Sequence, residues 1–158
     1  HAELHRRLSA LAREELVHFE RALKLLAGRG VAFAPQASSG YAERLKRAVR
    51  RDVDGRLADE LLVASIIEAR SHERMGLLAR ALAADAPEVA AFYAELCPAE
   101  ERHEALYQEL AALVVGAGAA ATRHAELARH EATVLVELPW APRLHGGLPA
   151  ARAEAGRA

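Results

Sequence analysis

Apolar residues recur every three or four positions along most of the chain, and this spacing predicts amphipathic helices rather than strands. No run of β-branched residues alternates with polar ones, as it would in a half-buried strand. Glycine and proline interrupt the helical pattern at a few points, and these points set the expected boundaries. The predicted helices cover residues 2–27, 41–51, 54–84, 87–115 and 120–137.

Local signals support several of these boundaries. Gly28 suits the end of the first helix because glycine adopts the left-handed conformation at low cost, and Asp54 is the expected N-cap of the third helix. Pro98 lies inside the fourth helix, where its ring and missing N–H should kink or interrupt it. We therefore expect an all-α bundle over residues 1–138 and an irregular tail, rich in proline and glycine, over residues 139–158.

The composition is consistent with one helical domain and constrains its partners only weakly. The chain has 158 residues, of which only 4% are aromatic. The chain has 21 lysines and arginines and 22 acidic residues, so its net charge is only −1. Any contact with nucleic acid must therefore depend on a local positive patch. Cys97 is the one cysteine and cannot form an intrachain disulfide, and no stretch of about 18 apolar residues exists. We expect a cytoplasmic protein without a membrane segment.

Three of the predicted helices carry ionisable residues on the face that should point into the core. In the first helix these are Glu15 and His18, and in the fourth they are Glu100 and His103, with the same Glu-x-x-His spacing. Glu68 occupies the equivalent position in the third helix. The apolar stripes that define these faces run through Leu4, Leu8, Leu11, Ala22 and Leu25; through Leu57, Leu61, Ala64, Ser71, Met75, Leu78 and Leu82; and through Val89, Tyr93, Leu96, Tyr107, Leu110 and Val114.

Such a cluster of inward carboxylates and imidazoles indicates a bound cation, because an uncompensated buried carboxylate is costly. Residues three apart share one face of a helix, so each Glu-x-x-His pair can reach the same metal cluster. Di-iron carboxylate bundles carry two such helices and one further glutamate from each of two others. Five of those six ligands have counterparts here, and this oxygen-rich set suits iron or manganese better than structural zinc. A buried salt-bridge network with arginines is the alternative. The five residues are Glu15, His18, Glu68, Glu100 and His103.

Other histidines and glutamates have suitable chemistry but lie out of phase with the apolar stripes. His72 follows Glu68 by four residues, and we expect it beside the ligands or at the surface rather than among them. In the fifth helix we expect the stripe Ala121, Ala125, Ala128, Ala132 and Leu135 to face inward. That phase would leave most of the polar candidates of this helix outside, namely His124, Glu126, His130 and Glu131.

Several segments resemble the tRNA 2-methylthio-isopentenyl-adenosine hydroxylase family, and the resemblance covers nearly the whole chain. It implies a ferritin-like four-helix bundle with additional helices. It also implies that Glu15, His18, Glu68, Glu100 and His103 are catalytic and bind two non-haem iron ions. The segments that carry the resemblance are residues 12–20 (AREELVHFE), 67–74 (IEARSHER), 101–103 (ERH), 123–131 (RHAELARHE) and 143–146 (RLHG).

The activity that this resemblance implies is a monooxygenase reaction. Dioxygen and an external electron donor would serve to hydroxylate the isopentenyl group of an adenosine beside the anticodon. The implied partners are a tRNA anticodon stem-loop and an electron-transfer partner. The family also has an N-terminal helix whose glutamate supplies a sixth ligand, and nothing before His1 matches it. Glu3 cannot take its place, because it precedes Glu15 by twelve residues, about 18 Å of helical rise.

The densest cationic run lies in the predicted second helix and is the candidate RNA-binding surface. Arg44, Arg47 and Arg51 fall on one helical stripe suited to phosphates, and Lys46 and Arg50 lie beside them. An ordinary solvated face is the alternative. Two other classes of function stay open, namely a ferritin-like iron-oxidising or iron-storage protein with the same ligands, and a metal-free helical interaction protein.

Overall fold

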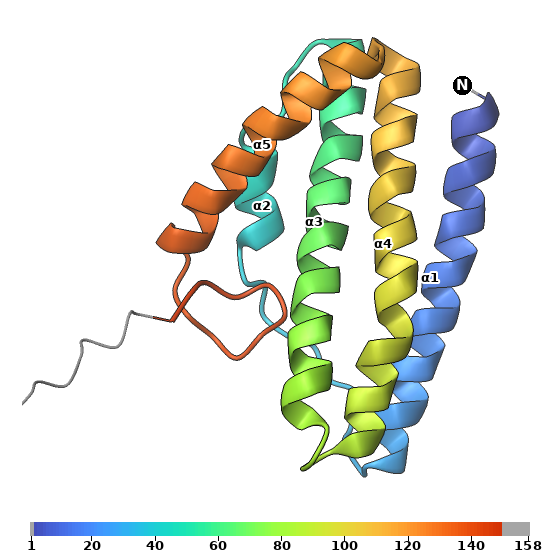
Figure 1. Cartoon of the computed structure of the whole chain (residues 1–158), viewed down its shortest axis with the longest axis vertical. Coiled ribbons are helices and arrows are strands. Elements are labelled where there is room, and N and C mark those ends of the chain that lie inside the picture. The colour runs from blue at the N-terminus through green and yellow to red at the C-terminus, as the bar shows by residue number, and fades with distance from the viewer. Residues whose placement is uncertain (1, 150–158) are drawn as a thin grey trace, which may run out of the picture.

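The computed structural model describes residues 2–149, and within that range it contains five helices and no strand (Figure 1). α1, α3 and α4 run side by side as long rods, while α5 crosses the upper part of α3 with the short α2 beneath it. The predicted all-α fold is confirmed. The helices are α1 (Ala2–Gly28), α2 (Tyr41–Lys46), α3 (Val53–Leu82), α4 (Pro87–Val115) and α5 (Ala117–Glu137).

The connection between α2 and α3 is longer than predicted. α2 ends at Lys46 rather than Arg51, because the next backbone N–H groups bond to carbonyls three residues back and the N–H of Arg50 bonds to the carboxylate of Asp59. The N-cap of α3 is Asp52 and not Asp54, since the Asp52 side chain accepts a 2.8 Å hydrogen bond from the N–H of Gly55. The predicted helical stripe of arginines therefore does not form.

α3 and α4 form the central packed pair. Leu62 of α3 and Leu110 of α4 are almost completely buried in the core between the helices. α4 runs without interruption through Pro98, so of the two predicted effects, a kink or an interruption, the interruption is wrong. Leu96 and Ala99 on either side of this proline are buried, and their packing offsets the lost backbone hydrogen bond. The predicted bounds of this helix are confirmed.

α1 is attached to the rest of the molecule less extensively. Within residues 2–149, α4 is the only helix whose backbone lies close to α1, and only Leu4 and Leu11 of α1 are buried. Three ion pairs join the two helices at their surface, and several apolar side chains of α1 are exposed. The pairs are Arg7–Glu109, Arg21–Glu95 and Glu14–Arg102, and the exposed side chains are Leu16, Val17 and Phe19.

The face of α5 that points inward differs from the prediction. The expected alanines are mostly exposed, because the larger Leu127 and Val134 bury more apolar surface when the helix is rotated the other way. This rotation also buries Glu131, which accepts 2.9 Å hydrogen bonds from the hydroxyl of Tyr41 and from the guanidinium of Arg70. Glu131 therefore has a structural role that its sequence position did not reveal.

A second buried carboxylate joins three segments. Asp59 of α3 is fully buried and pairs with Arg50 at 2.8 Å and with Arg123 of α5 at 2.9 Å. Burial alone would raise the pKa of Asp59, but the hydrogen bonds from Arg123 and Arg50 outweigh it and hold the pKa below its ordinary value. This network holds α5 and the α2–α3 connection against α3.

Residues 138–149 form a loop without helix or strand that returns to α3. His145 stacks on Tyr41, with ring centroids 5.1 Å apart, and its Nε2 lies 3.2 Å from the hydroxyl of Ser71. Arg74 donates hydrogen bonds to the carbonyls of Leu144 and Gly146. The rest of the predicted tail lies outside the described residues. Across residues 2–149, every helix is too short or too polar to span a lipid bilayer.

Candidate metal centre

α1 and α4 bring their Glu-x-x-His pairs together. Nδ1 of His18 lies 3.5 Å from Oε1 of Glu15, and Nδ1 of His103 lies 2.8 Å from the same oxygen. The two imidazole centroids are 6.0 Å apart. Glu100 and His103 are buried, and one donor atom from each of Glu15, His18 and Glu100 lies within 4.8 Å of the others. The two sequence motifs therefore meet between α1 and α4, where His18 and His103 are largely buried and the Glu15 side chain is still 41% exposed.

Glu68 of α3 completes this cluster of acidic groups. Burial raises the pKa of Glu68 well above its usual range, and the adjacent carboxyl of Glu100 and the charge of Glu15 raise it further. Three carboxyl groups thus lie close enough to repel one another when no cation is present. Tyr107 lies on the same face of α4. Its burial and the negative charges of Glu68 and Glu15 raise its pKa to about 12.

The donor atoms themselves fit a metal ion. Oε1 of Glu15, Nδ1 of His18 and Nδ1 of His103 are buried and make no well-aligned hydrogen bond, although Nδ1 of His103 lies 2.8 Å from Oε1 of Glu15. Leaving such atoms unpaired is unfavourable, and a cation that binds their lone pairs removes the penalty. Carboxylate oxygens and imidazole nitrogens suit iron or manganese, and no cysteine takes part. Among the residues that the structure describes, the group whose donor atoms converge closely enough to hold an ion is Glu15, His18 and Glu100, and Glu68 and His103 lie just outside it.

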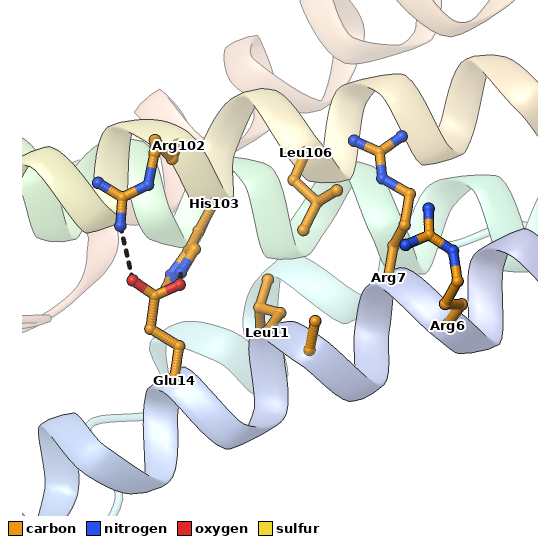
Figure 2. Close-up of a pocket in the computed structure, with 8 residues that line it drawn as sticks. Arg6, Arg7, Leu11, Glu14, Arg102, His103 and Leu106 are labelled. Atoms are coloured by element: carbon orange, nitrogen blue, oxygen red, sulfur yellow. Dashed lines mark hydrogen bonds and ion pairs between the residues drawn. The ribbon is translucent and has the colours of Figure 1, made fainter.

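Glu14 is a site residue that the sequence analysis missed. Its Oε2 lies 3.1 Å from Nε2 of His103, and its Oε1 accepts a 2.6 Å hydrogen bond from Arg102 (Figure 2). The carboxylates of Glu15 and Glu14 raise the pKa of His103 to about 9. A carboxylate on the outer nitrogen of a metal-binding imidazole fixes the orientation of the ring. The available signal in the sequence was its position directly before Glu15.

Replacing Glu14 by alanine should weaken metal binding about 10- to 100-fold, because His103 would lose the partner that orients it. The measurement is a competitive titration with a chelator of known affinity. Glu20→Ala is the matched control, since Glu20 is an exposed glutamate of the same helix. Equal affinities for the two variants would contradict the positioning role of Glu14.

A cavity of about 350 Å³ lies beside this centre, between α1 and α4. His103 and Glu14 close one end, Leu11 and Leu106 form its middle, and Arg7 stands at the far end beside Arg6 (Figure 2). Its mixed lining of cations and leucines gives small polar molecules a route to the buried imidazole.

The remaining candidates lie elsewhere. His72 is partly buried on α3 and is absent from the group of converging donor atoms found in residues 2–149. In the fifth helix, His130 lies within 3.1 Å of the carbonyl of Arg44, and Nε2 of His124 is buried without a hydrogen bond. Neither histidine is near enough to join the group around Glu15.

The cationic run around α2 is partly engaged in the fold. Arg50 pairs with Asp59, and Arg44 lies 3.6 Å from Glu137. The other three cations are exposed and make no ion pair within the described part of the chain. They are Lys46, Arg47 and Arg51.

Comparison with known proteins agrees with the fold and the site. Residues 1–146 match the family model described as tRNA-(MS[2]IO[6]A)-hydroxylase (MiaE). The tRNA 2-(methylsulfanyl)-N(6)-isopentenyladenosine(37) hydroxylase of Pseudomonas putida is 40% identical over 154 residues, which cover 97% of this chain and 73% of that protein. The enzyme of the same name from Salmonella typhimurium is 33% identical over 147 residues, 92% of this chain and 52% of that protein.

A solved structure gives the same picture. "Protein 43 with aldehyde deformylating oxygenase activity from Synechococcus" superposes with a TM-score of 0.81 and 39% identity, over 89% of this chain and 70% of that one. The likeness confirms the predicted ferritin-like architecture. Because the family model matches residues 1–146 of the chain and a relative is 40% identical, the chain belongs to the tRNA-(MS[2]IO[6]A)-hydroxylase (MiaE) family.

Proposed function

We propose that this chain hydroxylates the isopentenyl group of 2-methylthio-isopentenyl-adenosine in tRNA, at a non-haem di-iron centre and with dioxygen as co-substrate. The observation that carries the proposal is the convergence of donor atoms of Glu15, His18 and Glu100 within 4.8 Å of one another, with Nδ1 of His103 2.8 Å from Oε1 of Glu15. Membership in a family named for this hydroxylation supports the choice of substrate.

Five residues are the proposed ligands, and the chain's other groups hold them in place. Bound iron would supply the activation of dioxygen and the oxidation of an unactivated C–H bond. Glu14 keeps Nδ1 of His103 turned toward the cluster by binding Nε2. Leu96 and Leu110, both buried, lie on either side of the cluster along α4 and anchor this part of the helix in the core. The proposed ligands are Glu15, His18, Glu68, Glu100 and His103.

The proposed partners follow from this chemistry. An external electron-transfer partner would reduce the centre between turnovers, and a tRNA anticodon stem-loop would present the modified adenosine. We propose a cytoplasmic location, since the tRNA substrate is found there.

The decisive experiment is a nucleoside mass analysis. The chain is loaded with iron, reduced, and incubated under ¹⁸O₂ with tRNA that carries the unhydroxylated nucleoside. The expected product is the same nucleoside with one added, labelled oxygen atom. An iron-loaded chain that consumes dioxygen and oxidises iron but leaves the nucleoside unchanged would favour the iron-oxidising or iron-storage function instead.

Charge reversal at Arg47 and Arg51 should weaken binding of the anticodon stem-loop and reduce its salt dependence, because each arginine lost removes about one phosphate contact. We expect about a tenfold loss of affinity at moderate salt for the double glutamate variant. The measurement is fluorescence anisotropy of labelled RNA at several salt concentrations. Arg6→Glu makes one such charge reversal at an exposed arginine of α1, half the charge change of the double variant, and should have little effect. A double variant with an unchanged salt slope would argue for a merely solvated surface.

A further inference from the structure

A second cavity, of about 500 Å³, lies between the lower part of α3, α4 and the 138–149 loop. Its volume falls in the usual range for small-ligand sites. Two aromatic and two apolar side chains supply much of its surface, and two arginines stand among them. They are Tyr93, Trp140, Leu78, Leu148, Arg74 and Arg143.

The loop that forms one wall is built into the fold. Arg74 donates hydrogen bonds of 2.6 and 2.7 Å to the carbonyls of Leu144 and Gly146. The N–H of Gly147 bonds to the carbonyl of Pro139, and a Cβ at Gly147 would lie only 1.9 Å from the carbonyl oxygen of Leu138. Only glycine fits such a close approach of two backbones. The wall therefore holds its shape before any ligand arrives.

The chemistry of the cavity is that of a site for an unpaired nucleotide. Trp140 is 60% exposed and Leu148 is 52% exposed, so an apolar, partly aromatic surface faces water. The residues that line the cavity include no carboxylate, and neither Arg74 nor Arg143 makes an ion pair within residues 2–149. An exposed indole offers a stacking face for any base, and guanidinium groups that bond only to backbone carbonyls keep an uncompensated positive charge that attracts the phosphate accompanying it.

We propose that this cavity binds an unpaired base of the RNA substrate, stacked on Trp140, with the adjoining phosphate near Arg143. The proposal rests on the proposed function, since it takes the substrate to be RNA. Tyr93 precedes Glu100 by seven residues on α4, about 10 Å along the helix axis. This separation assigns the cavity to a base next to the reacting nucleotide, which it anchors while the modified adenosine lies at the metal cluster.

Trp140 is also the only tryptophan of the chain, so its fluorescence reports directly on this cavity. Addition of an anticodon stem-loop to the full chain should quench the emission, with a midpoint that matches the dissociation constant from anisotropy of labelled RNA. A blunt RNA duplex without unpaired bases should leave the emission unchanged. Quenching by the duplex to the same extent would overturn the assignment to an unpaired base.

Variants of Trp140 distinguish a side chain that stacks on a base from one that is merely exposed to solvent. Trp140→Ala should weaken stem-loop binding about tenfold, because one stacked base contributes that much, whereas Trp140→Phe keeps an aromatic face and should bind nearly as well as the parent. Phe33→Ala is the matched control, since Phe33 is a 66% exposed aromatic outside the cavity. Circular-dichroism melting checks that each variant folds. Equal binding by the parent and Trp140→Ala would overturn the proposal.

The two proposals can fail separately. Stem-loop quenching of Trp140 without any hydroxylated nucleoside would leave the base-binding cavity standing and refute the proposed reaction. Hydroxylation with no change in Trp140 emission would do the reverse. Emission that depends on protein concentration but not on RNA would identify the cavity as a contact between two copies of the chain, which also overturns the proposal.

Discussion

Replacement of Glu100 by alanine should leave the chain without bound iron and without hydroxylase activity. Glu100 is 5% exposed, and one of its oxygens lies within 4.8 Å of donor atoms of Glu15 and His18. Loss of a residue that only supports a ligand costs about 10- to 100-fold in metal affinity or activity, and loss of a ligand should cost more. We expect about two irons per chain in the parent protein after anaerobic loading and none in the variant.

The matched control is Glu101→Ala, because Glu101 is the next residue of α4 and is exposed. It should keep both its iron and its activity. Iron is measured by elemental analysis and activity by the added oxygen on the nucleoside, with Glu15→Ala and His103→Ala as two further ligand variants. Full iron occupancy in Glu100→Ala would contradict the proposed ligand set, even if activity were lost.

The second prediction with a large expected effect concerns the free energy of unfolding rather than hydroxylase activity. Asp59→Asn should lower the free energy of unfolding by about 3 kcal/mol, near the lower end for a broken buried ion pair. The lower end applies because the side chains of Arg50 and Arg123 are 41% and 20% exposed and so regain some solvation. For a domain of this size the melting temperature should fall by about 10 °C. Glu60→Gln is the control, since its exposed pair with Arg56 should contribute less than about 1 kcal/mol.

The same carboxylate predicts a direction of pH dependence. The folded pKa of Asp59 lies below its ordinary value of 3.8, so its stabilising contribution is complete above that value. The contribution is lost as the pH falls through the lower, folded pKa, because the proton then breaks both arginine pairs. Urea melts of the parent between about pH 5 and pH 2 should show this acid destabilisation, and Asp59→Asn should show less of it. Parallel pH curves for the two proteins would refute the assignment.

Much of the bundle was readable from the sequence because its helices are long and strongly periodic. The bounds of α4 were predicted as observed, and the meeting of the two Glu-x-x-His motifs followed from residues that interrupt apolar stripes. α5 was misread, since a row of alanines and a row containing Leu127 and Val134 both have helical spacing. Choosing between them needs the shape of the surface on which the helix packs.

The connection after α2 shows a second limit. Lysine and arginine favour helix, and nothing local to residues 47–51 marks an end. The helix ends because the backbone of Arg50 binds Asp59, a partner nine residues away whose buried position depends on α5. Glu14 was missed for a related reason, since its importance comes from contacts with His103 and Arg102, which lie almost ninety residues further along the chain.

The slight attachment of α1 has a consequence for how a metal ion bound at the proposed site would be released. α1 carries Glu15 and His18, yet it buries only Leu4 and Leu11 against its neighbour. A bound ion would therefore hold α1 against α4. The tighter the ion is bound, the larger the free energy needed to separate α1 from the rest of the bundle. Amide hydrogens of α1 should then exchange much faster after chelation, while those of α3 keep their protection. Release of the ion and fraying of the first helix would be one cooperative event.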